Sequence, residues 1–154
     1  MDLIVNEKKH KADAKYQSPV VSKFINMIME RGKKTIARNH VYKMLSILEE
    51  KTKNDGLFVF ETALKNVGPT LEVKSKRIGG ANYQVPVIVP DQRRLTLAMR
   101  WIITFARAKK GRSINEKLAD EIISAFKGEG SAVKKRIDVQ KMAEANKAFA
   151  HFGK

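Results

Sequence analysis

Apolar residues recur with a helical period through most of the chain. After the Ser18-Pro19 pair, Val21, Phe24, Ile25 and Ile28 lie three or four positions apart, which places them on one face of a helix. Ser18 is a favourable N-cap, and Pro19 is a favourable first helical residue. The same spacing predicts five further helices, whose apolar stripes are Ala37, Val41, Met44, Leu45 and Leu48; Leu57, Phe60, Leu64 and Val67; Leu95, Ala98, Met99, Ile102, Phe105 and Ala106; Leu118, Ile122, Ala125 and Phe126; and Val139, Met142, Ala143 and Phe149.

Glycine, proline and capping residues indicate where these helices begin and end. Asp91 is the expected N-cap of the fourth helix. Ser113 and Glu116 have the spacing of a capping box, which would open the fifth helix. The breaks between helices are expected at Gly32, Asn54-Asp55-Gly56, Gly68-Pro69 and Gly128-Glu129-Gly130.

Between residues 71 and 89 the apolar pattern changes from a helical period to alternation. Leu71, Val73 and Ser75 alternate with charged residues, and Tyr83, Val85, Val87 and Val89 alternate after the Gly79-Gly80 pair. Two alternating runs around a double glycine predict an antiparallel β-hairpin with a loop of several residues. The expected fold class is therefore mainly α: a six-helix, bundle-like body with a protruding two-stranded antiparallel β-hairpin.

An isolated two-stranded ribbon is only marginally stable in water. We therefore expect the base of the hairpin to lean on the helices, and Pro86, which has no amide hydrogen, to lie on a free strand edge. The basic tip, formed by Lys74, Lys76 and Arg77, should project outward.

The composition fits one soluble, intracellular domain. The chain has 154 residues, of which 43% are hydrophobic, enough to bury a core. We expect a basic N-terminal arm over residues 1–17, which contains Lys8, Lys9 and Lys11, and a single helical domain over 18–154. The absence of cysteine excludes disulfides and thiolate metal sites, and no apolar run is long enough to span a membrane.

Charge is the property that points most clearly to a partner. Lys and Arg number 31 against 16 Asp and Glu, a formal net charge of +15. Bases exceed acids in each of the segments 1–55, 56–90, 91–130 and 131–154, so the folded body itself must present positive surface. Such a field attracts polyanions, either nucleic acid or an anionic membrane.

The fourth predicted helix carries an arginine ridge. Arg93, Arg100 and Arg107 recur every seven residues, opposite the apolar face. No Asp or Glu lies between Arg93 and Arg112, so the ridge is expected to be unpaired unless an anion faces it. The planar guanidinium suits bidentate phosphate contacts.

Catalytic and cofactor motifs are absent. His10, His40 and His151 have no metal-ligand spacing. Gly32-Lys33-Lys34-Thr35 is not a phosphate loop, because Met27 stands where the motif needs its first glycine and Lys34 stands where it needs Ser or Thr directly after the lysine. We expect no enzyme activity, no cofactor and no metal. Tyr83 has two open interpretations: it stacks on a base or ribose, or it packs against the ribbon.

Several segments, taken in order from about Tyr16 to the end, resemble the family of the seventh protein of the bacterial-type small ribosomal subunit. The first 15 residues depart from the family, whose members usually begin with a dense arginine run. The segments that carry the resemblance are Gly32-Lys33-Lys34, Glu72-Val73-Lys74-Ser75-Lys76-Arg77, Gly79-Gly80-Ala81-Asn82-Tyr83-Gln84-Val85-Pro86-Val87, Leu97-Ala98-Met99-Arg100-Trp101, Ala132-Val133-Lys134-Lys135 and Met142-Ala143-Glu144-Ala145-Asn146-Lys147-Ala148-Phe149-Ala150-His151.

The resemblance implies a location in the ribosome, in the cytoplasm of a bacterium or in an organelle. It implies primary binding to a multi-helix junction in the 3′ major domain of 16S ribosomal RNA, which organises the head of the subunit. It also implies that the ribbon points toward the exit-site transfer RNA and the messenger path, and that neighbouring small-subunit proteins, including the eleventh, lie close by.

We therefore interpret the chain as a structural RNA-binding protein of the small ribosomal subunit. The alternatives are a basic helical regulator that binds duplex DNA and a protein that binds an anionic membrane surface. The residues expected to bind RNA are Lys8, Lys9, Lys11, Lys33, Lys34, Lys74, Lys76, Arg77, Arg93, Arg94, Arg100, Lys109, Lys110, Arg112, Lys134, Lys135 and Arg136.

Overall fold

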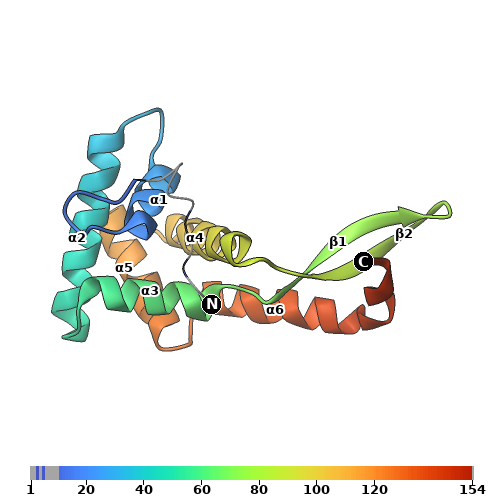
Figure 1. The fold of residues 1–154 in the computed structure, drawn as a ribbon. Helices are drawn as coiled ribbons and strands as arrows, with labels where there is room; N and C mark the ends of the chain where they lie inside the picture. Colours follow the sequence, from blue (N-terminus) through green and yellow to red (C-terminus); the bar gives the residue numbers. More distant parts are fainter. Residues whose placement is uncertain (1–2, 4, 6–10, 154) are drawn as a thin grey trace.

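The computed structural model describes residues 3, 5 and 11–153. In Figure 1 the helices gather at one end, and a two-stranded ribbon projects from them with α6 running beneath it. The predicted fold class is confirmed. In chain order the elements are α1 (Pro19–Ile28), α2 (Lys34–Thr52), α3 (Gly56–Val67), β1 (Leu71–Ile78), β2 (Ala81–Ile88), α4 (Asp91–Ala108), α5 (Ile114–Phe126), α6 (Ser131–Ala145) and the 3-10 helix η1 (Lys147–Gly153).

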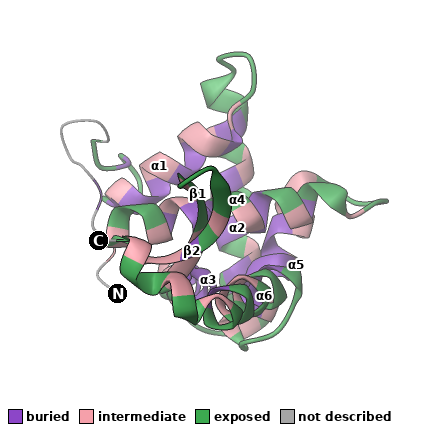
Figure 2. Ribbon diagram, turned by 90° about the vertical axis from the view of Figure 1, so that its right-hand side faces the viewer, coloured by how far each residue is buried: buried purple, intermediate pink, exposed green. Residues whose placement is uncertain are grey.

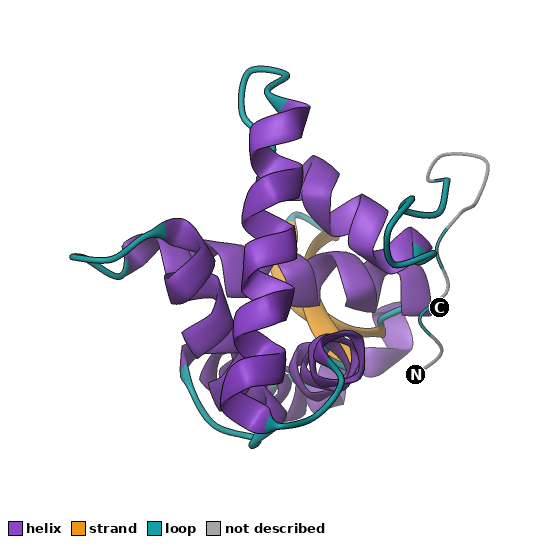
Figure 3. Ribbon diagram, turned by 90° about the vertical axis from the view of Figure 1, so that its left-hand side faces the viewer, coloured by secondary structure: helices purple, strands orange, loops and turns teal. Residues whose placement is uncertain are grey.

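The hydrophobic core is formed by residues of α1, α2, α3, α4 and α5, with Ala132 and Val133 at the start of α6. Helix α5 contacts α2, α3 and α4, and the ring of Phe24 packs 4.8 Å from that of Phe60, centroid to centroid. Every residue of the stripe predicted for α2 is buried, which confirms that stripe. Viewed from the end opposite the ribbon, the helices pack around one another and the connecting loops stand out at the rim (Figure 3). These loops carry several of the predicted RNA-binding cations.

Helix ends differ from the predictions in three places. The Oγ of Ser18 accepts a hydrogen bond from the backbone N–H of Val21 as predicted, but α1 ends at Ile28, where its apolar face ends, rather than at Gly32. Asp91 is the first residue of α4 and its N-cap is Pro90. Ser113 is the N-cap of α5, yet its side chain makes no capping hydrogen bond.

The last predicted helix is two elements. Helix α6 ends at Ala145, and Phe149 belongs to η1. Met142 was expected on a buried stripe, but it is 55% exposed. The reason is that α6 extends past the core and runs along the ribbon, so that its buried residues are only Ala132, Val133 and Ala143.

The ribbon is an antiparallel pair in which Leu71 lies opposite Ile88 and Ile78 lies opposite Ala81. The expected loop of several residues is wrong: Gly79 and Gly80 alone form the turn, with φ of 57° and 86°. Positive φ at both central residues is the geometry of a two-residue hairpin turn that matches the strand twist. The exposed residues near this turn are visible in Figure 2, which looks onto the ribbon end.

The pairing register decides which faces the apolar residues occupy. Val85 lies opposite Lys74, and Pro86 lies opposite Val73. Directly opposed residues share a face. The apolar run of β1 and the apolar run of β2 therefore lie on opposite faces of the ribbon, an arrangement that alternation within each strand did not reveal.

Replacing Gly79 and Gly80 with valine should disrupt the ribbon and leave the helices intact. Valine at positive φ costs about 1–2 kcal/mol per residue. Amide hydrogen exchange in β1 and β2 should accelerate while the helical circular dichroism stays constant. Ala81→Val, one residue beyond the turn, is the matched control and should have no such effect. A loss of helical signal would contradict the prediction.

The segment before α1 is held against α2 by one carboxylate. Asp13 is 7% exposed and accepts hydrogen bonds from the backbone N–H groups of Lys15 and Tyr16 and from the hydroxyl of Tyr42, all at 2.9–3.0 Å. Burial, together with the hydrogen bond to Asp13, raises the pKa of Tyr42. Lys8 and Lys9 lie outside the described residues, so an arm over 1–17 stays a prediction.

Candidate nucleic-acid interface

Two loops of the helical body carry predicted RNA-binding cations. The α1–α2 loop carries Lys33, with Lys34 at the start of α2, and the α4–α5 loop carries Lys109, Lys110 and Arg112. Lys33 and Arg107, at the end of α4, line the same pocket of about 420 Å³, together with Ile28, Glu30, Ile36, Ala37, His40 and Ile114. The α1–α2 loop therefore lies beside the end of α4 and the start of α5, and we call the α1–α2 and α4–α5 loops together the loop face.

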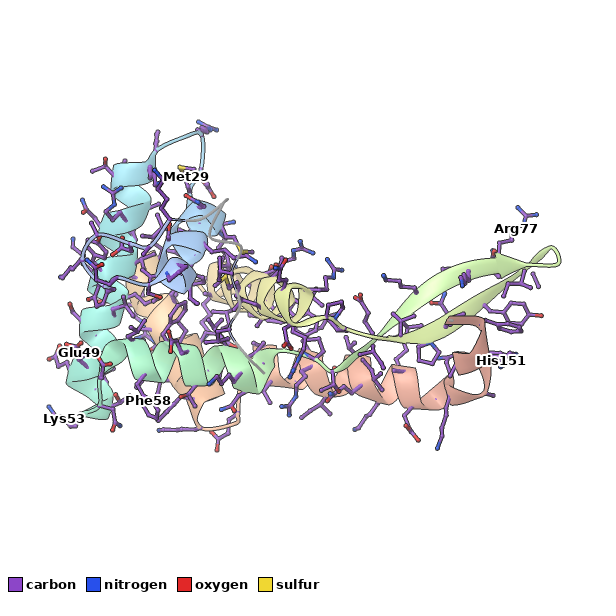
Figure 4. The ribbon with its side chains drawn as sticks, in the orientation of Figure 1. Met29, Glu49, Lys53, Phe58, Arg77 and His151 are labelled. Carbon is purple, nitrogen blue, oxygen red and sulfur yellow. The ribbon has the colours of Figure 1, made fainter. Side chains whose placement is uncertain are left out.

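A second set of cations lies on the ribbon. Lys74, Lys76 and Arg77 are exposed as predicted, and Figure 4 shows Arg77 at the tip, pointing away from the body. The remaining predicted cations lie on α4 (Arg93, Arg94 and Arg100) and in the first turns of α6 (Lys134, Lys135 and Arg136). The described predicted cations thus occupy the loop face, the ribbon and the helices α4 and α6.

The expectation that the arginine ridge of α4 is unpaired is wrong. The Nη2 of Arg93 lies 3.4 Å from a carboxylate oxygen of Glu72 on β1. The Nη2 of Arg107 lies 3.2 Å from Glu30 and donates to the carbonyl oxygen of Ile28 at 3.1 Å. The acids that pair with Arg93 and Arg107 come from other elements, so the absence of Asp and Glu between Arg93 and Arg112 was not informative. Among the described residues, Arg100 is the ridge arginine without such a partner.

Two further predicted arginines hold the end of α3. Arg94 donates to the carbonyl oxygen of Gly68 at 3.4 Å and pairs with Asp91 at 3.5 Å. Arg136 donates to the carbonyl oxygen of Asn66 at 2.7 Å. Cations near a helix C-terminus interact favourably with the unpaired carbonyls and the helix dipole. These guanidinium groups therefore join α4 and α6 to α3, and they are only partly accessible to a ligand.

Comparison with known proteins identifies the family. The model of the family described as "Ribosomal protein S7p/S5e" matches residues 2–147. This chain belongs to that family. The protein named small ribosomal subunit protein uS7 of Pelotomaculum thermopropionicum is 57% identical over 140 residues, covering 91% of this chain and 90% of its own length. The uS7 proteins of Chloroflexus aggregans and Myxococcus xanthus are 50% identical over 151 residues and 52% identical over 149 residues, each covering 96% of its own length and 98% and 97% of this chain.

Membership in the S7p/S5e family confirms the resemblance drawn from the sequence. The family consists of structural ribosomal proteins, which also confirms the expectation that the chain is not an enzyme. Among the described residues, no cluster of three or more His, Asp or Glu side chains is arranged to hold a metal ion. No helix in the described part of the chain is long and apolar enough to cross a membrane.

Within this family member, a buried carboxylate organises the loop face. Glu121 on α5 is 1% exposed, and its Oε1 accepts a hydrogen bond from the backbone N–H of Ala132 at 3.0 Å. Its Oε2 lies 2.9 Å from the Nζ of Lys109. Lys117 also donates to the carbonyl oxygen of Lys109 at 2.9 Å. Glu121 therefore fixes both the α4–α5 loop and the start of α6, a role that its place in the sequence did not signal.

The cations of the predicted set that have no side-chain partner are the ones most available to a ligand. Lys109 forms an ion pair with Glu121, and Arg112 forms one with Asp120 at 2.6 Å. Arg31, in the α1–α2 loop, is exposed and was missed by the sequence reasoning, although it directly precedes Gly32-Lys33. Among the described members of the predicted set, those without a hydrogen bond or ion pair from the side chain are Lys11, Lys33, Lys34, Lys74, Arg77, Arg100, Lys110, Lys134 and Lys135.

Proposed function

We propose that this chain, a structural constituent of the small ribosomal subunit, binds the 3′ major domain of 16S ribosomal RNA and organises the head. The observation that carries the proposal is the group of exposed, unpaired cations on the loop face and the ribbon. Its relatives are named as small ribosomal subunit proteins, which supports the same function.

The charge balance favours a polyanionic partner. Even if each of the 16 acidic residues paired with one of the 31 basic residues, 31 − 16 = 15 cations would remain. RNA phosphates supply that negative charge along a continuous surface, and contacts to phosphate position a protein without reading sequence. A rigid helical body with cations on separate projections suits a folded RNA whose helices meet at a junction, because such a surface reads shape.

The ribbon supplies a contact away from the body. We propose that it points toward the exit-site transfer RNA and the messenger path, with neighbouring small-subunit proteins, including the eleventh, close by. Its projection from the helices and the exposed Arg77 at its tip support this orientation. We propose the same role in RNA contact for Lys8, Lys9 and Lys11 of the N-terminal segment.

Competition separates this function from duplex-DNA binding. Full-length protein bound to a labelled transcript of the 3′ major domain should be displaced by the unlabelled transcript, but not by duplex DNA at the same nucleotide concentration. Equal displacement by the DNA would overturn the proposal in favour of a DNA-binding regulator. Liposomes of anionic lipid that displaced the RNA would instead favour membrane binding.

Replacing Arg100 with glutamine should weaken RNA binding without destabilising the protein. Arg100 is exposed and its side chain has no partner, so its loss should change the free energy of unfolding by less than about 0.5 kcal/mol. The slope of log affinity against log salt should fall by about 1. Filter binding over a salt series and thermal unfolding measure the two effects.

Arg107→Gln is the matched control on the same ridge. Arg107 donates to Ile28 and pairs with Glu30, so its loss should lower the free energy of unfolding by about 1 kcal/mol. Equal destabilisation by the two variants would show that Arg100 is structural and would contradict the prediction.

A further inference from the structure

The C-terminal 3-10 helix lies against the ribbon. Helix η1 contacts β2 and α6, and Figure 1 shows η1, at the red end of the colour scale, beside β2. The ring of Tyr83 on β2 lies 5.2 Å from the ring of Phe149 and 5.2 Å from that of Phe152, while the two phenylalanine rings are 6.3 Å apart and nearly parallel. We call these three residues the aromatic clamp. Tyr83 thus packs against η1 rather than against the ribbon itself.

The apolar face of β2 is covered by η1. Val85 is 0% exposed, although it lies in the projecting ribbon and outside the main core cluster. A Cβ built on Gly153 would lie 3.3 Å from a methyl carbon of Val85 and 3.3 Å from one of Val87. The backbone of η1 therefore packs directly onto these two valines, and unpacking η1 would expose them to water.

One lysine of the ribbon also contacts η1. The Nζ of Lys76, on β1, donates a hydrogen bond to the carbonyl oxygen of Phe152. Helix η1 therefore contacts both strands: it meets the ring of Tyr83 on β2 and the ammonium group of Lys76 on β1. Lys74 and Arg77, the neighbouring cations on β1, are exposed and have no side-chain partner.

Two-stranded ribbons need packing against another element for independent stability. Helix α6 packs on β1, and we propose that η1 is the element that positions β2: the aromatic clamp orders the ribbon beyond what α6 supplies and thereby holds Lys74 and Arg77 in place for RNA. The first half of this proposal, that η1 orders the ribbon, concerns the free protein. The second half, that this order holds Lys74 and Arg77 in place for RNA, rests on the proposed function.

Amide hydrogen exchange of the free, full-length protein tests the first half. In a Phe149→Ala, Phe152→Ala double variant, exchange in β1 and β2 should accelerate by at least about tenfold, which corresponds to about 1.4 kcal/mol of lost protection. Exchange in α2, α3 and α5 should not change. Unchanged exchange in the ribbon, or equal acceleration in the helices, would overturn the proposal.

Two controls distinguish the clamp from a general loss of aromatic surface. Phe149→Tyr with Phe152→Tyr keeps both rings and should restore slow exchange in the ribbon. Phe58→Ala removes a 55% exposed ring at the end of the molecule opposite the ribbon (Figure 4) and should leave ribbon exchange unchanged. Acceleration of ribbon exchange by Phe58→Ala would contradict a local role for the clamp.

A double-mutant cycle on RNA tests the second half. In the otherwise unchanged protein, Arg77→Gln should lower the salt slope of binding to the 3′ major domain transcript by about 1. In the clamp-deficient double variant, the same substitution should lower it by less than half as much, because a disordered ribbon no longer presents Arg77. If Arg77→Gln lowered the salt slope equally in the two backgrounds, the proposal that the clamp positions the cations would be overturned. A wild-type chain that does not bind the transcript would refute the proposed function, while hydrogen exchange would still decide the role of η1.

Discussion

Raising the salt concentration from about 50 to 200 mM should weaken binding of this chain to the 3′ major domain transcript by about 10³–10⁵, provided that about 6–10 phosphates are contacted. The exposed, unpaired cations of the loop face, the ribbon, α4 and α6 are numerous enough to make contacts on that scale. Each phosphate that a cation neutralises releases condensed counterions, and added salt opposes that release. Filter binding or fluorescence anisotropy over a salt series measures the slope.

A charge-reduced variant provides the matched comparison. Lys33→Gln with Lys34→Gln removes two exposed cations of the loop face, so the slope should fall by about 2. The fold should remain intact because neither side chain has an intramolecular partner. A slope near zero in the unchanged protein would contradict phosphate binding as the basis of affinity. An unchanged slope in the double variant would place the RNA away from the α1–α2 loop.

Replacing Glu121 with alanine should lower the free energy of unfolding by about 2–3 kcal/mol. The change leaves the backbone N–H of Ala132 without its acceptor and removes the partner of Lys109. An unsatisfied buried donor costs about 1–3 kcal/mol, and the cavity left by the side chain adds to that loss. Lys109 is 37% exposed and regains water, so the lost ion pair contributes less than a fully buried one would. Urea unfolding measures the loss.

Glu121→Gln is the control for this prediction. The amide oxygen keeps an acceptor for the N–H of Ala132, and only the pair with Lys109 is lost, so we expect a loss of about 1 kcal/mol or less. Equal destabilisation by alanine and glutamine would show that the charge, rather than the hydrogen bond at the start of α6, is what matters. No destabilisation by alanine would contradict the structural role of Glu121.

Local patterns in the sequence were sufficient for much of the fold. The helical spacing identified the buried stripe of α2, and Ser18-Pro19 identified the start of α1, because these features depend on residues within one or two turns. Alternation around Gly79-Gly80 identified the hairpin for the same reason. The length of its turn and its pairing register depend on contacts across the strands, so both emerged only from the structure.

The sequence also determined that this chain carries a large positive charge and a series of helices, since charge follows from residue counts and periodicity from neighbouring positions. Only the tertiary structure decided which cations are free. Glu72 and Glu30 reach Arg93 and Arg107 from other elements, and Glu121 reaches Lys109 across the α4–α5 loop. Such ion pairs join residues that the fold brings within about 4 Å whatever their separation along the chain. For the same reason, the packing of η1 on the ribbon could not be predicted from the residues of η1 alone, because it joins segments that are far apart in the sequence.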